Sequence, residues 1–177
     1  AHVSEDVCLV TNGILLDEDR IKSYAEAGLT EVAISVSSIE QYARRRDQAL
    51  LCKKYIPNTR LNIPKCNEST GDKLVELLKA CLTDNFYVVV CEDLMGRYSD
   101  FDFQEKMGTS KVKDDNCNFY DYIWKDEKGN SHQFGVFGNY TGYDATDIII
   151  TPVGNFCKWE QYCKKIGNSS LNKKYSS

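Results

Sequence analysis

The first half of the chain alternates short apolar runs with longer amphipathic segments. Four segments have the length of strands, at 7–10, 32–36, 60–63 and 86–91, and the continuous apolar run at 7–10 is expected of a strand buried on both faces. Between these runs apolar residues recur at helical spacing, most regularly at Leu74, Leu77, Leu78, Cys81 and Leu82. The predicted order over residues 7–95 is therefore β-α-β-α-β-α-β.

Polar residues and glycine predict where these helices begin and end. Asp17 precedes the first helix as an N-cap, and Gly28 follows it as the residue that ends the helix. Ser37 or Ser38 is expected to cap the second helix, and Ser69 or Thr70 the third. Short connections between capped helices and strands favour parallel strands joined by right-handed crossovers, which is an α/β fold.

The pattern changes at Gly96. Residues 96–118 are polar and charged, and they predict a long loop or lid. Two apolar segments, 119–124 and 132–137, flank a polar turn at 126–130, as expected of a β-hairpin. We expect residues 119–167 to pack on the same core as residues 1–95. The other elements expected are a strand at 147–151, a turn at 152–155, a short helix at 158–166 and a flexible tail at 168–177.

Composition narrows the class of protein. The charges are balanced and mildly acidic, with a net charge of −4, which argues against nucleic-acid binding, and the run Arg44-Arg45-Arg46 is expected to be a mainly solvated helix face. No apolar run approaches the roughly 20 residues of a membrane span, and the N-terminal residues lack a signal-peptide pattern, so we expect a cytoplasmic protein without a membrane partner. The eight cysteines form no C-x-x-C pair, and several lie within apolar patterns as small hydrophobes; a disulfide framework is the alternative.

The order of short motifs resembles a known family. A strand leads into Thr11-Asn12-Gly13, a helix ends in Ala27-Gly28-Leu29, and the next strand ends in Ile34-Ser35-Val36-Ser37-Ser38. This order resembles the later part of radical S-adenosylmethionine (SAM) enzymes, and in particular the GTP 3′,8-cyclase family of molybdenum-cofactor biosynthesis. The segments 59–62, 91–95 and 125–137 are similar to later parts of the same family. The resemblance implies a partial (β/α) barrel over residues 1–95, with four parallel strands.

The resemblance also implies a ligand site at the carboxyl ends of the strands, where α/β sheets hold ligands. The positions that resemble the family's SAM contacts are Ser35 and Leu94 or Met95. Asn12 is expected beside them in the same cradle. Those expected at the substrate are Thr11, Arg60 and Asn62. Hydroxyl and amide groups suit the ribose and carboxylate of SAM, and an apolar residue suits its adenine. No catalytic residue and no metal ligand is assigned.

The chain departs from the family at its cofactor. The family's C-x-x-x-C-x-x-C motif, which holds a 4Fe-4S cluster, is absent, and Cys117, Cys157 and Cys163 do not reproduce the spacing of the cyclase's second cluster. Reductive cleavage of SAM needs that cluster. The cluster would have to come from a segment N-terminal to Val7 or from a partner chain. A sheet that begins mid-barrel would expose an edge at its first strand, so either a partner segment covers that edge or the strand has moved to the centre.

Two functions follow as expectations. The first is a radical-SAM-like domain that binds SAM, a nucleotide-like small molecule or both, as a portion of a larger or split enzyme that is not catalytic alone. The second is a non-catalytic interaction or nucleotide-binding module derived from the half-barrel.

Several of these residues also have a structural interpretation. Thr11 and Asn12 could form a turn that caps the following helix, and the Ser35 hydroxyl could be satisfied by backbone. Arg60 could be a surface or ion-pair residue instead of a phosphate contact. Glu92 and Asp93 form an acidic pair at a strand end, either solvated or serving as a base or metal ligand.

Overall fold

The computed structural model describes residues 7–66, 69–91, 101–115, 119–137, 148–150 and 156–158. The chain divides into two units, residues 1–138 and residues 139–177. In the second unit, the described residues form two antiparallel strands, β8 (Ile148–Ile150) and β9 (Phe156–Lys158). The strand predicted at 147–151 is confirmed as β8, whereas β9 was not predicted. The predicted turn at 152–155 lies outside the described residues, as does the predicted helix beyond Lys158.

The first unit contains seven strands and four helices among its described residues. Along the chain they are β1 (Cys8–Thr11), α1 (Glu18–Glu26), β2 (Glu31–Ser35), α2 (Ile39–Tyr55), β3 (Asn58–Pro64), α3 (Gly71–Thr83), β4 (Tyr87–Cys91), α4 (Phe103–Met107), β5 (Ser110–Asp115), β6 (Phe119–Lys125) and β7 (Ser131–Phe137). The predicted alternation over the first four strands is confirmed.

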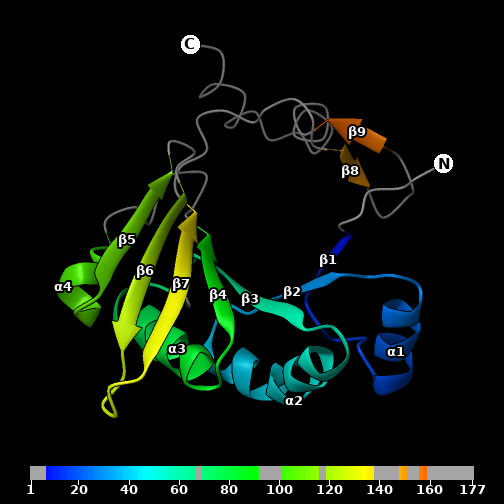
Figure 1. Cartoon of the computed structure of the whole chain (residues 1–177), viewed down its shortest axis with the longest axis horizontal. Helices are drawn as coiled ribbons and strands as arrows, with labels where there is room; N and C mark the ends of the chain where they lie inside the picture. Colours follow the sequence, from blue (N-terminus) through cyan, green and yellow to red (C-terminus); the bar gives the residue numbers. More distant parts are fainter. Residues whose placement is uncertain are drawn as a thin grey trace. The chain divides into compact units, whose positions relative to one another are not determined.

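All seven strands join one sheet in the order β1-β2-β3-β4-β7-β6-β5 (Figure 1). Strands β1 to β4 are parallel, and β7 runs parallel to β4 on its other side. Strand β6 is antiparallel to both of its neighbours, β7 and β5. The α/β class is confirmed, but the sheet is open and the predicted partial barrel is not confirmed. Strand β1 lies at an edge of the sheet, so of the two alternatives for the first strand the one in which it moves to the centre is wrong.

Helices α1, α2 and α3 lie on one side of this sheet (Figure 1). We call the side that they cover the helix face. The strand residues on it are apolar and almost fully buried, and they are Val32, Ile34, Leu61, Ile63, Val88, Val90 and Phe134. The side chains of the predicted α3 stripe, Leu74, Leu77, Leu78, Cys81 and Leu82, are at most 1% exposed and belong to the same core. Each such side chain contributes roughly 1.5–3 kcal/mol to folding.

Local signals set the helix ends as predicted. Asp17 Oδ1 accepts a hydrogen bond from Arg20 N at 2.9 Å, and Ser38 Oγ accepts one from Gln41 N at 3.2 Å. Gly28 follows α1 with a φ of +91°, a backbone conformation that residues with a Cβ rarely adopt. Thr70 is the N-cap residue of α3, although its side chain makes no capping hydrogen bond.

The predicted loop at 96–118 is wrong where it is described, because it contains α4 and β5. Asp102 caps α4 by accepting hydrogen bonds from Gln104 N and Glu105 N, at 2.8 and 3.0 Å. The buried Phe103 ring lies 5.5 Å from Phe134, a residue of the helix face. Phe101 and Phe103 therefore anchor this segment to the core, and their burial outweighs the polar composition of the segment.

The predicted hairpin is confirmed as β6 and β7. Asp126 closes its turn by accepting hydrogen bonds from Lys128 N and Asn130 N, at 2.9 and 2.8 Å. The Asn130 side chain and the nearby His132 ring lower the pKa of Asp126 to about 2. Pairing of β7 with β4 makes the hairpin part of the main sheet.

Candidate ligand-binding face

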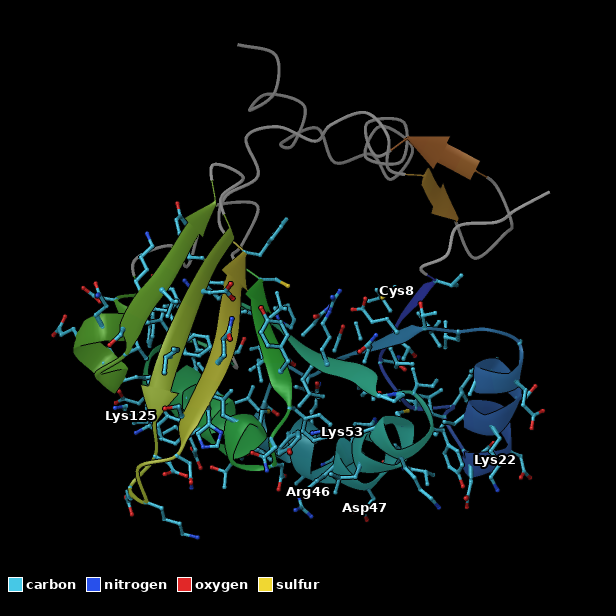
Figure 2. All side chains as sticks on the ribbon, in the orientation of Figure 1. Cys8, Lys22, Arg46, Asp47, Lys53 and Lys125 are labelled. Carbon is cyan, nitrogen blue, oxygen red and sulfur yellow. The ribbon has the colours of Figure 1, made fainter. Side chains whose placement is uncertain are left out.

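The sheet has a second surface, which we call the polar face, on the side opposite α1, α2 and α3. Its strand residues alternate with those of the helix face, since successive side chains of a strand point to opposite sides. Ser35 pairs with Asn62 across β2 and β3, and Arg60 lies two residues before Asn62 on the same face. Three of the predicted site residues are therefore neighbours. Figure 2 shows Cys8 on the other side of the sheet from Arg46 and Lys53, which lie on α2.

Thr11 and Asn12 have a local role. Thr11 pairs with Ile34, a residue of the helix face, and its Oγ1 accepts a hydrogen bond from Gly13 N at 3.1 Å. Asn12 Oδ1 accepts one from Ile14 N, also at 3.1 Å. Gly13 has a φ of +74°, and a Cβ there would lie 3.2 Å from Ile34 Cγ2. These contacts match the turn interpretation, and the register puts Thr11 on the face opposite Arg60.

The remaining predicted positions cannot be placed in this surface. Leu94 and Met95 lie outside the described residues, and so do Glu92 and Asp93. The predicted apolar wall for adenine therefore has no described counterpart.

Arg60 is the central charge of the polar face. Its guanidinium forms an ion pair with Glu31 on β2, and both side chains are about one-third exposed. The ion-pair interpretation of Arg60 thus holds for its Nη1. Arg60 Nε, however, is buried and has no hydrogen-bond partner among the described residues.

Asn62 supplies the complementary group. Its Oδ1 is also buried and lacks a hydrogen-bond partner within the described segments. A buried polar atom left in this state costs about 1–3 kcal/mol. The face thus contains a donor and an acceptor, both buried and without a partner among the described residues, two positions apart on β3, with Ser35 on the neighbouring β2.

A second polar contact lies across the same face. Tyr87 Oη donates a hydrogen bond to Asp121 Oδ1 at 3.0 Å, joining β4 to β6. Burial raises the pKa of Tyr87, and the Asp121 carboxylate raises it further, while Arg60 opposes this effect. Tyr87 is therefore a neutral hydrogen-bonding phenol at physiological pH.

The thiols of this face, Cys8 and Cys91, stay protonated at neutral pH. Burial raises the pKa of Cys91 and that of Cys8, and Glu31 adds to the increase at Cys8 while Arg60 opposes it at both residues. A thiol that stays protonated is a poor nucleophile and a poor metal ligand. No cluster of His, Cys, Asp and Glu that could hold a metal occurs in the described part of the chain.

Sequence reasoning missed Glu31, Tyr87 and Asp121. The signal was present, since Glu31 and Tyr87 stand at the first positions of apolar strands, where a polar side chain is conspicuous. Their shared face follows only from the register, because Asp121 belongs to a hairpin whose place beside β4 was not predicted.

Comparison with known proteins does not assign this chain to a family. No family model matches the chain, and no curated protein shows a significant match to it. No helix within the described ranges is long and apolar enough to cross a membrane.

Proposed function

We propose that the polar face binds a small molecule of the SAM or nucleotide class, as a radical-SAM-like domain built on part of a (β/α) barrel. The observation that carries the proposal is the pair of unused polar atoms, Arg60 Nε and Asn62 Oδ1, beside Ser35. An anionic oxygen of a ligand would accept from Arg60, and a hydroxyl or amine would donate to Asn62.

The residues fit SAM in part. Arg60 suits the methionine carboxylate or a phosphate, while Asn62 and Ser35 suit ribose hydroxyls. When bound next to a reduced iron–sulfur cluster, SAM supplies a carbon radical. The described cysteines do not form a cluster site, so the proposal gives this chain the binding role and assigns the cluster to another segment or a partner chain.

Free thiols support a cytoplasmic location as part of the same proposal. Cys8, Cys52, Cys66, Cys81 and Cys91 are all unpaired. Disulfides are rare in the reducing cytoplasm, and free cysteines of this number are typical of it.

The second candidate is a non-catalytic nucleotide-binding or interaction module. The local role of Thr11 and Asn12 favours it, because two of the residues expected at the ligand instead stabilise a turn.

Calorimetry with the full chain tests the proposal, using SAM and GTP as separate probes. Binding of either should weaken about tenfold or more in Arg60→Met, a loss of about 1.4 kcal/mol. The control is Arg44→Met, which removes an exposed arginine of α2 and should leave affinity unchanged. Circular dichroism would verify that both variants fold.

The outcomes separate the candidates. SAM binding by iron-free protein supports the radical-SAM-like reading, whereas GTP binding without SAM binding supports the nucleotide module. Failure of both probes to bind the wild-type chain would contradict a ligand site on the polar face. Equal weakening by Arg60→Met and Arg44→Met would show that Arg60 has no special role.

A further inference from the structure

Two opposite charges lie side by side on the polar face. Glu31, the first residue of β2, pairs with Asn58, and Arg60 follows two residues later on β3, so the two charged side chains are diagonal neighbours on one face. They form an ion pair in which each side chain remains about one-third exposed. Both charges therefore stay within reach of a ligand that lies on this face.

The charges around this pair sum to zero. Glu31 and Arg60 are the only charged residues that the register places on the polar face of β1 to β4, four strands whose residues are all described. The nearest charge beyond them along the same face is again negative, since Asp121 of β6 accepts a hydrogen bond from Tyr87. A polyphosphate, which brings several negative charges, would find no excess of positive charge here.

Both members of the pair keep hydrogen-bonding capacity. A guanidinium has five N–H donors, and the contact of Arg60 with Glu31 is made through Nη1. A carboxylate has two oxygens with about four acceptor positions. Besides Arg60, Glu31 has the Cys8 thiol as a neighbour, whose pKa it raises. The pair can thus bind one anionic and one cationic group at the same time and remain paired.

Such a pair disfavours ligands with charge of a single sign. A lone carboxylate or phosphate beside Arg60 would be repelled by Glu31, and a lone amine beside Glu31 would be repelled by Arg60. An α-amino acid group carries an ammonium and a carboxylate on one carbon atom. Its two charges can face Glu31 and Arg60 respectively, so that the four charges alternate in sign and each end forms charge-assisted hydrogen bonds.

We propose that the ligand of the polar face carries an α-amino acid group, whose carboxylate is bound by Arg60 and whose ammonium is bound by Glu31. This assignment rests on the ligand site proposed above and narrows its ligand class, because it favours small molecules with an amino acid end over nucleoside polyphosphates. Glu31, which the sequence did not suggest, becomes a specificity-determining residue. Ser35 and Asn62 are left for hydroxyl groups of the same ligand.

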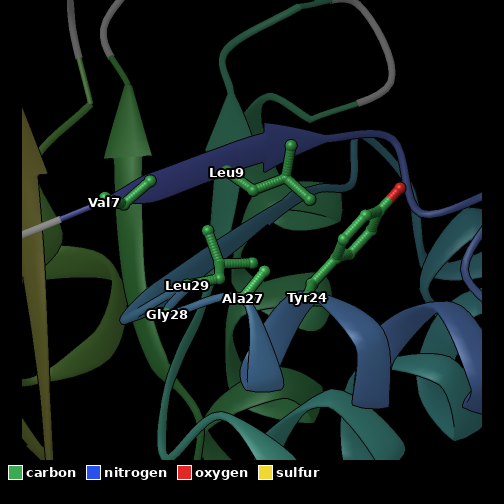
Figure 3. A pocket seen from close by; sticks show the side chains of 6 residues that line it. All are labelled: Val7, Leu9, Tyr24, Ala27, Gly28 and Leu29. Atoms are coloured by element: carbon green, nitrogen blue, oxygen red, sulfur yellow. The ribbon is translucent and has the colours of Figure 1, made fainter. Parts of the chain in front are cut away.

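An apolar groove elsewhere in the first unit has a different chemistry. It has a volume of about 310 Å³ and is lined by Val7, Leu9, Tyr24, Ala27, Gly28 and Leu29 (Figure 3). Leu9 pairs with Val32, a residue of the helix face, so this wall of the groove lies on the opposite side of the sheet from Arg60. The six lining residues are uncharged and offer no partner to an ammonium or a carboxylate.

Calorimetry of the full chain with two matched ligands tests the assignment. S-adenosylhomocysteine and 5′-methylthioadenosine share adenine, ribose and a thioether, and only the first has an α-amino acid group. We expect S-adenosylhomocysteine to bind the wild-type chain about tenfold more tightly or better. Glu31→Gln should weaken the binding of S-adenosylhomocysteine about tenfold and leave that of 5′-methylthioadenosine unchanged.

The control is Glu76→Gln, which removes an exposed glutamate of α3 and should leave both affinities as in wild type. Circular dichroism verifies that both variants fold, and the comparison of the two ligands needs no variant. Equal affinity of the wild-type chain for the two ligands, or equal effects of Glu31→Gln on both, would overturn the assignment and leave the ligand site standing. GTP binding without S-adenosylhomocysteine binding would do the same. A chain that binds none of the three ligands would contradict the site itself.

Discussion

The two faces of the sheet use the same strands for different purposes. On the helix face, side chains such as Ile34, Leu61 and Phe134 are 0% exposed and contribute through buried area. On the polar face, Arg60 and Glu31 remain about one-third exposed, and two polar atoms have no partner among the described residues. A face that keeps unsatisfied groups is costly for stability, so the comparison separates the residues that hold the fold from those available to a ligand.

The helix face should give the largest effect. Phe134→Ala removes a fully buried ring that contacts Phe103 and Tyr122, and we expect it to lower the free energy of unfolding by about 3–5 kcal/mol. Urea unfolding followed by circular dichroism measures this. The control is Gln133→Ala, an exposed neighbour on the polar face, which should change stability by about 0.5 kcal/mol or less. Similar losses in both variants would remove the distinction between the faces.

Breaking the ion pair of the polar face should cost little. Glu31→Gln should lower the free energy of unfolding by about 1 kcal/mol or less, because water screens a pair whose side chains are one-third exposed. A double-mutant cycle with Arg60→Met, at low and high salt, isolates the coupling. A coupling above about 3 kcal/mol that is insensitive to salt would mean that this face also holds the fold.

The smallest effect should appear only at alkaline pH. The folded state raises the pKa of Tyr87 above its ordinary value of 10, so its contribution to stability is complete below pH 10 and is lost as pH rises further. Tyr87→Phe should therefore reduce the loss of stability above pH 10. Urea unfolding at pH 8 and above pH 10 tests this, with Tyr24→Phe on α1 as the control. An identical pH dependence of Tyr87→Phe and wild type would argue against the raised pKa.

Much of the helix face could be predicted from the sequence. Apolar periodicity located β1 to β4 and the α3 stripe, and the caps at Asp17 and Ser38 follow from side-chain chemistry within a few residues. The hairpin of β6 and β7 was predicted for the same reason, since its strands and turn are contiguous. These features depend on interactions between residues that are close together in the sequence, so the sequence pattern predicts them.

The polar face could be predicted only in part. Ser35, Arg60 and Asn62 share it because consecutive parallel strands end at the same edge, which the strand order implies. Tyr87 and Asp121 meet only because β7 lies beside β4, a pairing between distant segments. The helix α4 was missed because its anchor, Phe103, acts through a residue of β7. The resemblance to radical SAM enzymes stays a prediction.

The strand order also has a consequence for synthesis of the chain. Strands β1 to β4 are neighbours both in sequence and in space, so each can pair as soon as it has been made. Strand β4 can pair on its second side only with β7, which the ribosome completes after β5 and β6. During that interval the nascent sheet ends in Tyr87-Val88-Val89-Val90-Cys91, an uncharged edge of high β propensity. Misassembly of this protein should therefore begin at β4, in the time before the hairpin arrives.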